Sequence, residues 1–141
     1  MTLGPWLRRV LKHNEPEHLR RGHLGEKVAR RYLKRCGLKF LTANYKTRGG
    51  EIDLVFRDGD CLVFVEVKTR SDESWTRPAE AVNLDKRRRL SLAALDYLKR
   101  LKERCVDFRF DIVEVLWRNG EADEVRHLPN AFELDHRYRY D

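Results

Sequence analysis

Two apolar segments, residues 52–56 and 61–67, constrain this chain most, because a short polar turn joins them. Both segments are rich in β-branched and aromatic residues, which favour strands. Asp58-Gly59 between them favours a tight turn, since glycine accepts the positive φ that such turns need. The sequence therefore predicts a β-hairpin. Four charged residues interrupt its apolar pattern: Glu51, Asp53, Glu66 and Lys68.

The length of the turn decides which way these charges point. We take Asp58 and Gly59 as a two-residue loop, which places Asp53 opposite Phe64. Side chains alternate between the two faces along each strand, and paired residues share a face. All four charges then project from one face, and the apolar residues Ile52, Leu54, Val63, Val65 and Val67 project from the other. A four-residue loop keeps this arrangement, whereas a three-residue loop would separate the charges.

Carboxylates that share one face of neighbouring strands attract a divalent cation. On this register Asp53 and Glu66 are diagonal neighbours, an arrangement suited to Mg²⁺, which uses one or two carboxylates together with waters and a substrate phosphate. Lys68 lies on the same face, where its ammonium is placed to hold a phosphate oxygen or to orient the attacking water. A bound metal would activate that water. The pattern favours hydrolysis of a phosphodiester.

A simpler interpretation treats Glu66 and Lys68 as a salt bridge on a solvated face, worth at most about 1 kcal/mol. The continuous apolar run over residues 61–65 argues against solvation, because it implies that both faces of the strand are buried. Unpaired carboxylates in such surroundings cost several kcal/mol. Spacing alone leaves both interpretations open.

An amphipathic helix is predicted over residues 18–36, where apolar residues recur at helical spacing and Gly37 ends the pattern. Glu26 lies on the flank of the apolar stripe, since each residue advances by about 100°. It either faces a cleft between helix and sheet or is a surface residue paired with the arginine four residues on. Gly22 and Gly25 are costly in a helix and suggest a close approach of the backbone to the hairpin.

The second half of the chain predicts another helix and another hairpin. Asp85 is interpreted as the N-cap of a helix that runs to about Arg104, and residues 107–117 form a strand that leads to the turn Asn119-Gly120. The remaining elements are a strand over residues 38–45, a polar loop over 69–78 that contains Arg70, Trp75 and Arg77, and a return strand over 125–128.

Four consecutive positive charges, residues 86–89, fall in the first turn of the second helix. The helix dipole disfavours cations there. Contact with phosphate would explain them, and a solvated basic run is the alternative. The candidates for nucleic-acid contact are Arg70, Lys86 and Arg87.

Length and composition add further limits. The chain of 141 residues is long enough for one domain with a core. Its 30 Lys and Arg against 23 Asp and Glu give a net charge of +7, which favours acidic partners, nucleic acid first. Three scattered cysteines without CxxC spacing fit a reducing cytosol, and no apolar run reaches the length of a membrane span. We therefore expect a cytoplasmic protein.

Three motifs together resemble a known family: Gly-x-x-Gly-Glu at residues 22–26, Gly-Glu-Ile-Asp-Leu-Val at 50–55 and Val-Phe-Val-Glu-Val-Lys-Thr-Arg at 63–70. They resemble the YraN-like family of uncharacterised bacterial proteins, whose pattern is similar to that of the PD-(D/E)xK, restriction-endonuclease-like superfamily and close to archaeal Holliday-junction resolvases. The resemblance covers residues 22–115. The motif's proline before the aspartate is absent, since Ile52 stands there.

The resemblance implies an α/β fold, with an αβββαβ core in which a mixed central sheet is flanked by helices. It also implies cleavage of nucleic acid, DNA above all, that depends on Mg²⁺ or Mn²⁺. By position, Asp53 and Glu66 match the metal ligands and Lys68 matches the catalytic lysine. Glu26 matches a helix-borne glutamate that joins the catalytic and metal-binding set, and Glu51 is a weaker candidate.

We divide the chain into an N-terminal arm (residues 1–17), an endonuclease-like domain (18–130) and a C-terminal tail (131–141). The leading hypothesis is a metal-dependent endonuclease that acts on DNA, including branched or processed DNA. By analogy with junction enzymes of this fold, a homodimer is one expectation. The alternatives are a non-catalytic nucleic-acid-binding module of the same fold and a basic protein-interaction adaptor.

Overall fold

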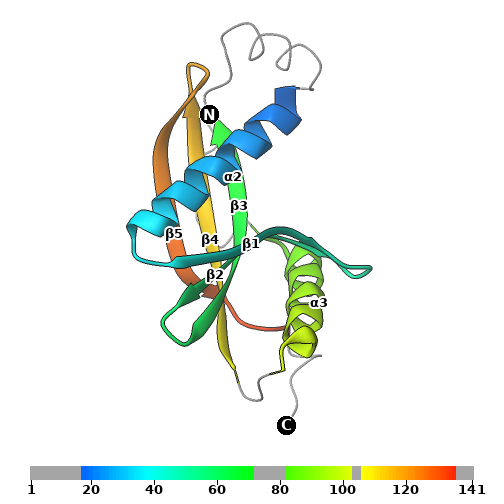
Figure 1. The fold of residues 1–141 in the computed structure, drawn as a ribbon. Coiled ribbons are helices and arrows are strands. Elements are labelled where there is room, and N and C mark those ends of the chain that lie inside the picture. The colour runs from blue at the N-terminus through cyan, green and yellow to red at the C-terminus, as the bar shows by residue number, and fades with distance from the viewer. Residues whose placement is uncertain (1–16, 72–81, 103–105, 136–141) are drawn as a thin grey trace, which may run out of the picture.

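The computed structural model describes residues 17–71, 82–102 and 106–135 of the chain (Figure 1). The predicted N-terminal arm lies outside these residues except for Glu17, as do Trp75 and Arg77 of the polar loop. The described residues form, in order, α2 (Glu17–Arg35), β1 (Lys39–Lys46), β2 (Glu51–Asp58), β3 (Cys61–Ser71), α3 (Leu84–Arg100), β4 (Asp107–Arg118) and β5 (Glu121–Phe132). Neither helix among them is long and apolar enough to cross a membrane.

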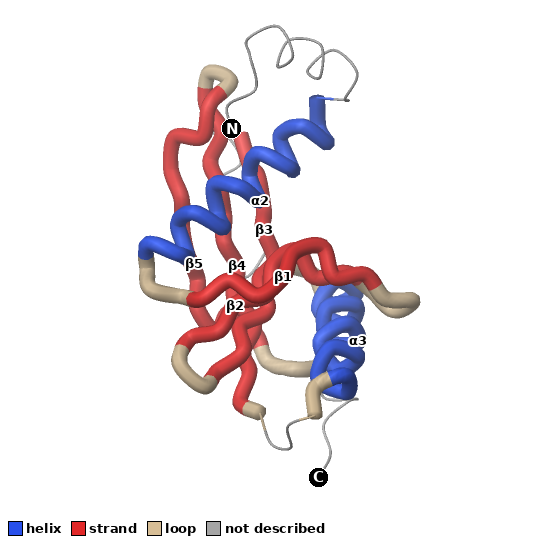
Figure 2. The backbone as a smooth tube through the Cα atoms, in the orientation of Figure 1, coloured by secondary structure: helices blue, strands red, loops and turns tan. Residues whose placement is uncertain are grey.

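The five strands form one mixed sheet in the order β1-β2-β3-β4-β5. Neighbouring strands are antiparallel except β3 and β4, which are parallel and are connected through α3. The helices lie on opposite faces of this sheet, with α2 crossing one face and α3 packed on the other (Figure 2). The predicted αβββαβ core with a mixed sheet between helices is confirmed.

Each helix packs on its own face of the sheet and forms a separate hydrophobic core there. Ala29 and Leu33 of α2 pack on Leu54, Phe56, Val63, Val65, Val113 and Val115. On the other face Leu90, Ala93 and Ala94 of α3 pack on Val55, Phe64, Phe110, Ile112 and Phe132. The central strands are therefore buried on both faces, as the continuous apolar run in β3 predicts.

Helix α2 ends at Arg35, just before Gly37, the glycine predicted to end it. Gly37 has a φ of +93°, and the Leu38 N–H donates to the Leu33 carbonyl over 3.1 Å, the six-residue bond of a Schellman motif. Within α2, a Cβ added to Gly25 would lie 2.3 Å from the Thr69 hydroxyl on β3. The predicted close approach to the hairpin is thus made by Gly25, whereas Gly22 has nothing within 4 Å.

The start of α3 differs from the prediction. Asn83 is the N-cap, because its side-chain oxygen accepts a hydrogen bond from the Lys86 N–H over 2.9 Å. Asp85 instead belongs to the first turn. The helix ends at Arg100, earlier than the predicted Arg104, because Leu101 takes an extended conformation. One face of α3 is apolar, since Leu90 and Ala94 are buried and Tyr97, Leu98 and Leu101 pack partly buried against the same core.

The second predicted hairpin is also present. Asn119 and Gly120 both have positive φ, 50° and 78°, and they connect β4 to β5. The return strand is longer than predicted, because β5 continues to Phe132, whose ring stacks on Phe110 with 4.8 Å between centroids.

Candidate active site

The loop of the first hairpin is shifted by one residue from the prediction. Asp58 pairs with Cys61, so the loop residues are Gly59 and Asp60, and Leu54 faces Val65. Only Gly59 has a positive φ in this loop, 58°, which is the pattern of a turn with glycine at its first position. The loop still holds two residues, so Glu66 and Lys68 keep the predicted face. Extending the pairing by one step brings Asp53 level with Glu66 rather than diagonal to it.

Strand β2 is irregular at Asp53. The Asp53 carboxylate, through Oδ2, accepts the Val67 N–H over 2.8 Å. Ile52 packs in the core under α3, together with Val55, whereas Leu54 packs under α2. The prediction that Ile52 and Leu54 share a face is therefore wrong, because side-chain alternation breaks between them.

The neighbouring strand β1 is irregular at the same level. Ala43 pairs with Leu54 and Tyr45 with Ile52, and Asn44 between them has a φ of +53°. Asparagine tolerates this left-handed conformation better than most residues. The Asn44 side chain forms a hydrogen bond with Glu26 of α2. Sequence reasoning missed this residue, and its only signal was an asparagine inside a strand, where asparagine is depleted.

Glu66 and Asp53 form what we call the carboxylate pair. Glu66 is buried, with 3% of its side chain exposed. Two ammonium groups reach its Oε1: Lys86 Nζ of α3 at 3.3 Å and Lys68 Nζ at 3.6 Å. Its Oε2 is buried and has no hydrogen-bond partner among the described residues.

The electrostatics of Glu66 follow from this environment. Burial raises its pKa, and the charge of Asp53 and a hydrogen bond between the two carboxyl groups raise it further, to about 7. Lys86 and Lys68 act in the opposite direction without cancelling the effect. The side chain therefore exchanges its proton near neutral pH, and it is stabilised as an anion only incompletely by the protein itself.

Glu26 lies on the flank of the carboxylate pair. Burial raises its pKa first, and the charge of Asp53 second, while His23 and the hydrogen bond with Asn44 lower it. The charge of Glu51 also raises the pKa of Glu26, although Glu51 itself is exposed. Within the described ranges, no three His, Cys, Asp or Glu side chains converge closely enough to hold a metal ion. The structure thus brings Asp53, Glu66 and Lys68 together and leaves Glu26 beside them.

The three residues predicted to contact nucleic acid have different partners in the structure. Lys86 belongs to the site through Glu66. Arg87 instead donates through Nε to the Val82 carbonyl over 3.1 Å, with its guanidinium 5.4 Å from the centre of the Phe132 ring. Arg70 Nε lies 3.6 Å from Glu114.

Another buried carboxylate, that of Asp111, differs from Glu66 in its hydrogen bonding. It is bound by Arg109 Nε at 3.0 Å, His127 Nε2 at 2.8 Å and the Asn130 N–H at 2.9 Å. Burial alone would raise the pKa of Asp111, but these hydrogen bonds lower it below its usual 3.8. The network lies where β4 and β5 change register, between Phe110 and Ile112. Both carboxylate oxygens of Asp111 have hydrogen-bond partners, so we interpret it as a structural group.

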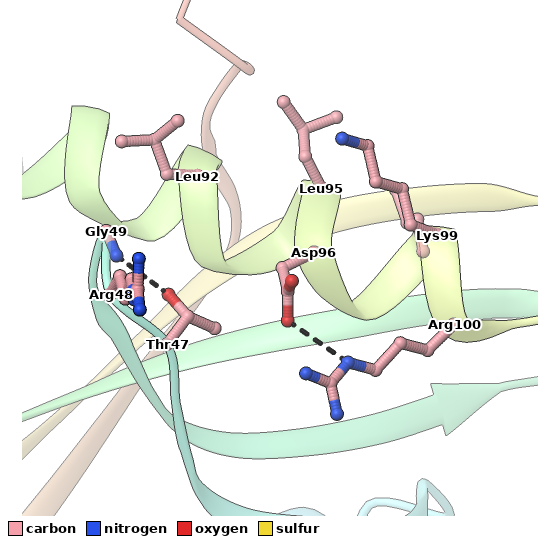
Figure 3. A pocket seen from close by; sticks show the side chains of 9 residues that line it. Thr47, Arg48, Gly49, Leu92, Leu95, Asp96, Lys99 and Arg100 are labelled. Atoms are coloured by element: carbon pink, nitrogen blue, oxygen red, sulfur yellow. Dashed lines mark hydrogen bonds and ion pairs between the residues drawn. The ribbon is translucent and has the colours of Figure 1, made fainter.

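A pocket of about 790 Å³ lies apart from the carboxylate pair, between α3 and the turn after β1 (Figure 3). Leu92 and Leu95 line it together with Asp96, which Arg100 Nε contacts at 3.4 Å and the Tyr45 hydroxyl at 2.6 Å. None of the charged residues of the candidate site lines this pocket. We therefore do not place the active site there.

The arrangement defines a mixed α/β protein whose five-stranded sheet and flanking helices are compatible with a restriction-endonuclease-like core, with two acids and two lysines gathered beside one strand. The chain belongs to UPF0102: the model of "Uncharacterised protein family UPF0102" matches residues 25–115. These residues include the carboxylate pair, Glu26, Lys68 and Lys86.

Relatives agree with this assignment. The chain is 43% identical over 113 residues to a UPF0102 protein of Geobacter metallireducens, covering 80% of this chain and 92% of that protein. It is 42% identical over 118 residues to a UPF0102 protein of Syntrophus aciditrophicus, covering 84% and 92%. A UPF0102 protein of Rhodococcus opacus is 40% identical over 111 residues, covering 79% and 94%.

Proposed function

We propose that this UPF0102 protein is a metal-dependent nuclease of the PD-(D/E)xK superfamily, which acts in the cytoplasm and hydrolyses phosphodiester bonds in DNA, including branched or processed DNA. The observation that carries the proposal is Glu66: a carboxylate with 3% of its side chain exposed, beside a second carboxylate, with one oxygen unbonded.

This arrangement lowers the stability of the fold. A buried carboxylate whose pKa is raised destabilises the folded state at neutral pH, and replacement by an uncharged side chain would remove that cost. Asp111 shows that the same sheet can bury a carboxylate with its bonds satisfied. Locally unfavourable chemistry that a fold retains is typical of a functional site.

The pair suits a hard divalent cation. The unbonded oxygen of Glu66 and the carboxylate of Asp53 are the ligand type that Mg²⁺ and Mn²⁺ use, and Mg²⁺ is commonly held by only one or two carboxylates with waters and substrate phosphate. Asp53 and Glu66 would hold the ion. When bound, it would lower the pKa of a water molecule and offset negative charge on the phosphate.

The other residues have roles that follow from their positions. The Lys68 ammonium, 3.6 Å from Glu66 and about one third exposed, is placed to hold a phosphate oxygen as negative charge develops on it. Glu26 is placed to orient water at the edge of the pair. Water then attacks phosphorus and gives up a proton to the solvent, while the bond to the leaving sugar oxygen breaks and that oxygen takes up a proton from the solvent. The net charge of +7 favours encounter with nucleic acid.

The direct test is cleavage of a panel of DNA substrates, namely duplex, single strand, flap and four-way junction, with Mg²⁺ or Mn²⁺. We expect Lys68→Ala to lower the cleavage rate by at least about a hundredfold, the usual scale for loss of a group that stabilises transition-state charge. Lys39→Ala, which removes an exposed lysine at the start of β1, is the matched control and should cleave like the wild type.

Equal rates for Lys68→Ala and the wild type on every substrate would refute the catalytic proposal. The binding-module alternative predicts no cleavage at all, together with salt-dependent DNA binding that persists in Asp53→Ala and Glu66→Ala.

A further inference from the structure

A second cleft, of about 330 Å³, adjoins the carboxylate pair. Six residues line it: Lys46, Thr47, Gly50, Glu51, Lys86 and Arg89. Lys86 belongs both to this cleft and to the site, because its Nζ lies 3.3 Å from Glu66. A water molecule occupies about 30 Å³, so the cleft has room for a phosphate group and part of its sugar.

The two walls of the cleft, the turn after β1 and the first part of α3, are in direct contact. A Cβ added to Gly50 would lie 2.3 Å from the Arg89 carbonyl oxygen, so the turn after β1 touches the backbone of α3. The Thr47 hydroxyl shapes this turn, since it accepts the N–H groups of Gly49 and Gly50 and donates to the Gly50 carbonyl. The walls therefore do not depend on flexible side chains for their position.

The charges on these walls favour an anion. Lys46, Lys86 and Arg89 outnumber the single acid, Glu51. Arg89 is 61% exposed, and its ion pair is with the equally exposed Asp85 one turn earlier in α3. Such exposed pairs contribute little, which leaves the guanidinium able to bind a ligand.

The cleft also explains the basic run at the start of α3. Lys86 and Arg89 are three residues apart and so share a helix face, the one that lines the cleft. Arg87 turns toward Val82 and Phe132 instead. Cations in a first turn oppose the helix dipole, and an anion bound between Lys86 and Arg89 would offset that cost.

We propose that this cleft binds a backbone phosphate of the nucleic-acid strand, next to the phosphate at the carboxylate pair, and that Lys86 is shared between the two. The proposal rests on the proposed function, because the ligand is the nuclease substrate. In the protein alone, the Lys86 ammonium is held by the Glu66 carboxylate, 3.3 Å from its Oε1. When a divalent cation neutralises that carboxylate, the ammonium is free to bind the phosphate in the cleft.

Binding measurements test the cleft without any cleavage. The probe is a short fluorescein-labelled single-stranded oligodeoxynucleotide, followed by anisotropy, first in EDTA and then in Ca²⁺, with a gel to confirm that the probe stays intact. Arg89→Gln and Lys46→Gln should each weaken binding by about tenfold, the scale of a lost charge-assisted bond. Each should also reduce the slope of log affinity against log salt by about 1. The matched control is Arg88→Gln, an exposed neighbour in the same basic run that does not line the cleft.

Lys86→Met tests the sharing of this residue. Ca²⁺ should strengthen oligonucleotide binding by the wild type, and Lys86→Met should lose most of that gain, whereas Arg89→Gln should weaken binding with and without Ca²⁺ alike. Thermal melts show whether each variant is folded.

Two results would overturn the proposal: no measurable binding by the wild type at low salt, or Arg89→Gln and Lys46→Gln binding as tightly as Arg88→Gln. Retention of the full Ca²⁺ gain by Lys86→Met would refute the sharing of Lys86. These outcomes differ from failure of the nuclease proposal, which is judged by cleavage in Lys68→Ala. Loss of binding in Arg89→Gln with no cleavage by any variant would support the cleft and refute the nuclease.

Discussion

Replacing Glu66 by glutamine should make the protein more stable at alkaline pH and leave its stability unchanged in mild acid. Burial and the Asp53 charge raise the pKa of Glu66 from 4.5 to about 7 in the folded state. Between these two values the unfolded chain releases its proton while the folded chain retains it, so stability falls as pH rises through this window. Below about pH 4.5 both states are protonated and the penalty disappears.

The size of the effect follows from the same two values. A difference of about 2.5 pH units at about 1.4 kcal/mol each gives a penalty of about 3 kcal/mol above pH 7. Glutamine has nearly the same shape but cannot ionise, so Glu66→Gln should gain that amount at about pH 8.5. For a chain of this size, about 3 kcal/mol corresponds to a rise in Tm of about 9 °C.

The assay is urea unfolding followed by circular dichroism, at about pH 4 and about pH 8.5, with EDTA to keep divalent cations away. The difference in unfolding free energy between variant and wild type should be close to zero at the lower pH and about 3 kcal/mol at the higher pH. A Glu66→Gln variant that is less stable than the wild type by the same amount at both values would refute the reasoning. It would show that the carboxylate of Glu66 is a structural group rather than a strained one.

Two further substitutions test the architecture around the site. Asp111→Asn should destabilise the fold by about 3 to 5 kcal/mol near neutral pH, as expected for breaking a buried ion pair. Because the pKa of Asp111 is lowered, its contribution is lost as pH falls below 3.8, and the difference should shrink in acid; an equal loss in acid and at neutral pH would contradict this. Gly50→Ala should destabilise by at least about 1 kcal/mol, since its Cβ would overlap the Arg89 carbonyl, whereas Gly22→Ala in an open helix position should stabilise by about 0.5 to 1 kcal/mol. A Gly50→Ala variant that unfolds at the same urea concentration as the wild type, or at a higher one, would show that the docking of Gly50 on α3 is not tight.

The order of helices and strands was predictable because local patterns specify it. β-Branched runs, the Asn119-Gly120 turn and Gly37 each act within a few residues of themselves. The face on which Glu66 and Lys68 lie was predictable for a related reason: the loop holds two residues whichever pair forms it, so the alternation of side chains is preserved.

The register was not predictable from the same pattern. Asp58-Gly59-Asp60 allows glycine at either loop position, since both types of hairpin turn accept it where φ is positive. The N-cap was missed for a comparable reason, because Asn83 and Asp85 both have side chains suited to capping and only the fold shows which one meets the Lys86 N–H.

The convergence of the site depends on contacts that no local pattern encodes. The irregularity at Asp53 coincides with the left-handed Asn44 on the next strand, and Lys86 reaches Glu66 while the two glycines after β1 let α3 lie against the turn. Sequence patterns therefore indicate which side chains can act together, because alternation assigns them a face. Tertiary packing decides which of them come within a few ångströms, and in this chain it adds Lys86 from a helix that begins eighteen residues after Glu66. That lysine distinguishes the site from an isolated strand motif, since its reach joins the carboxylates to a basic cleft.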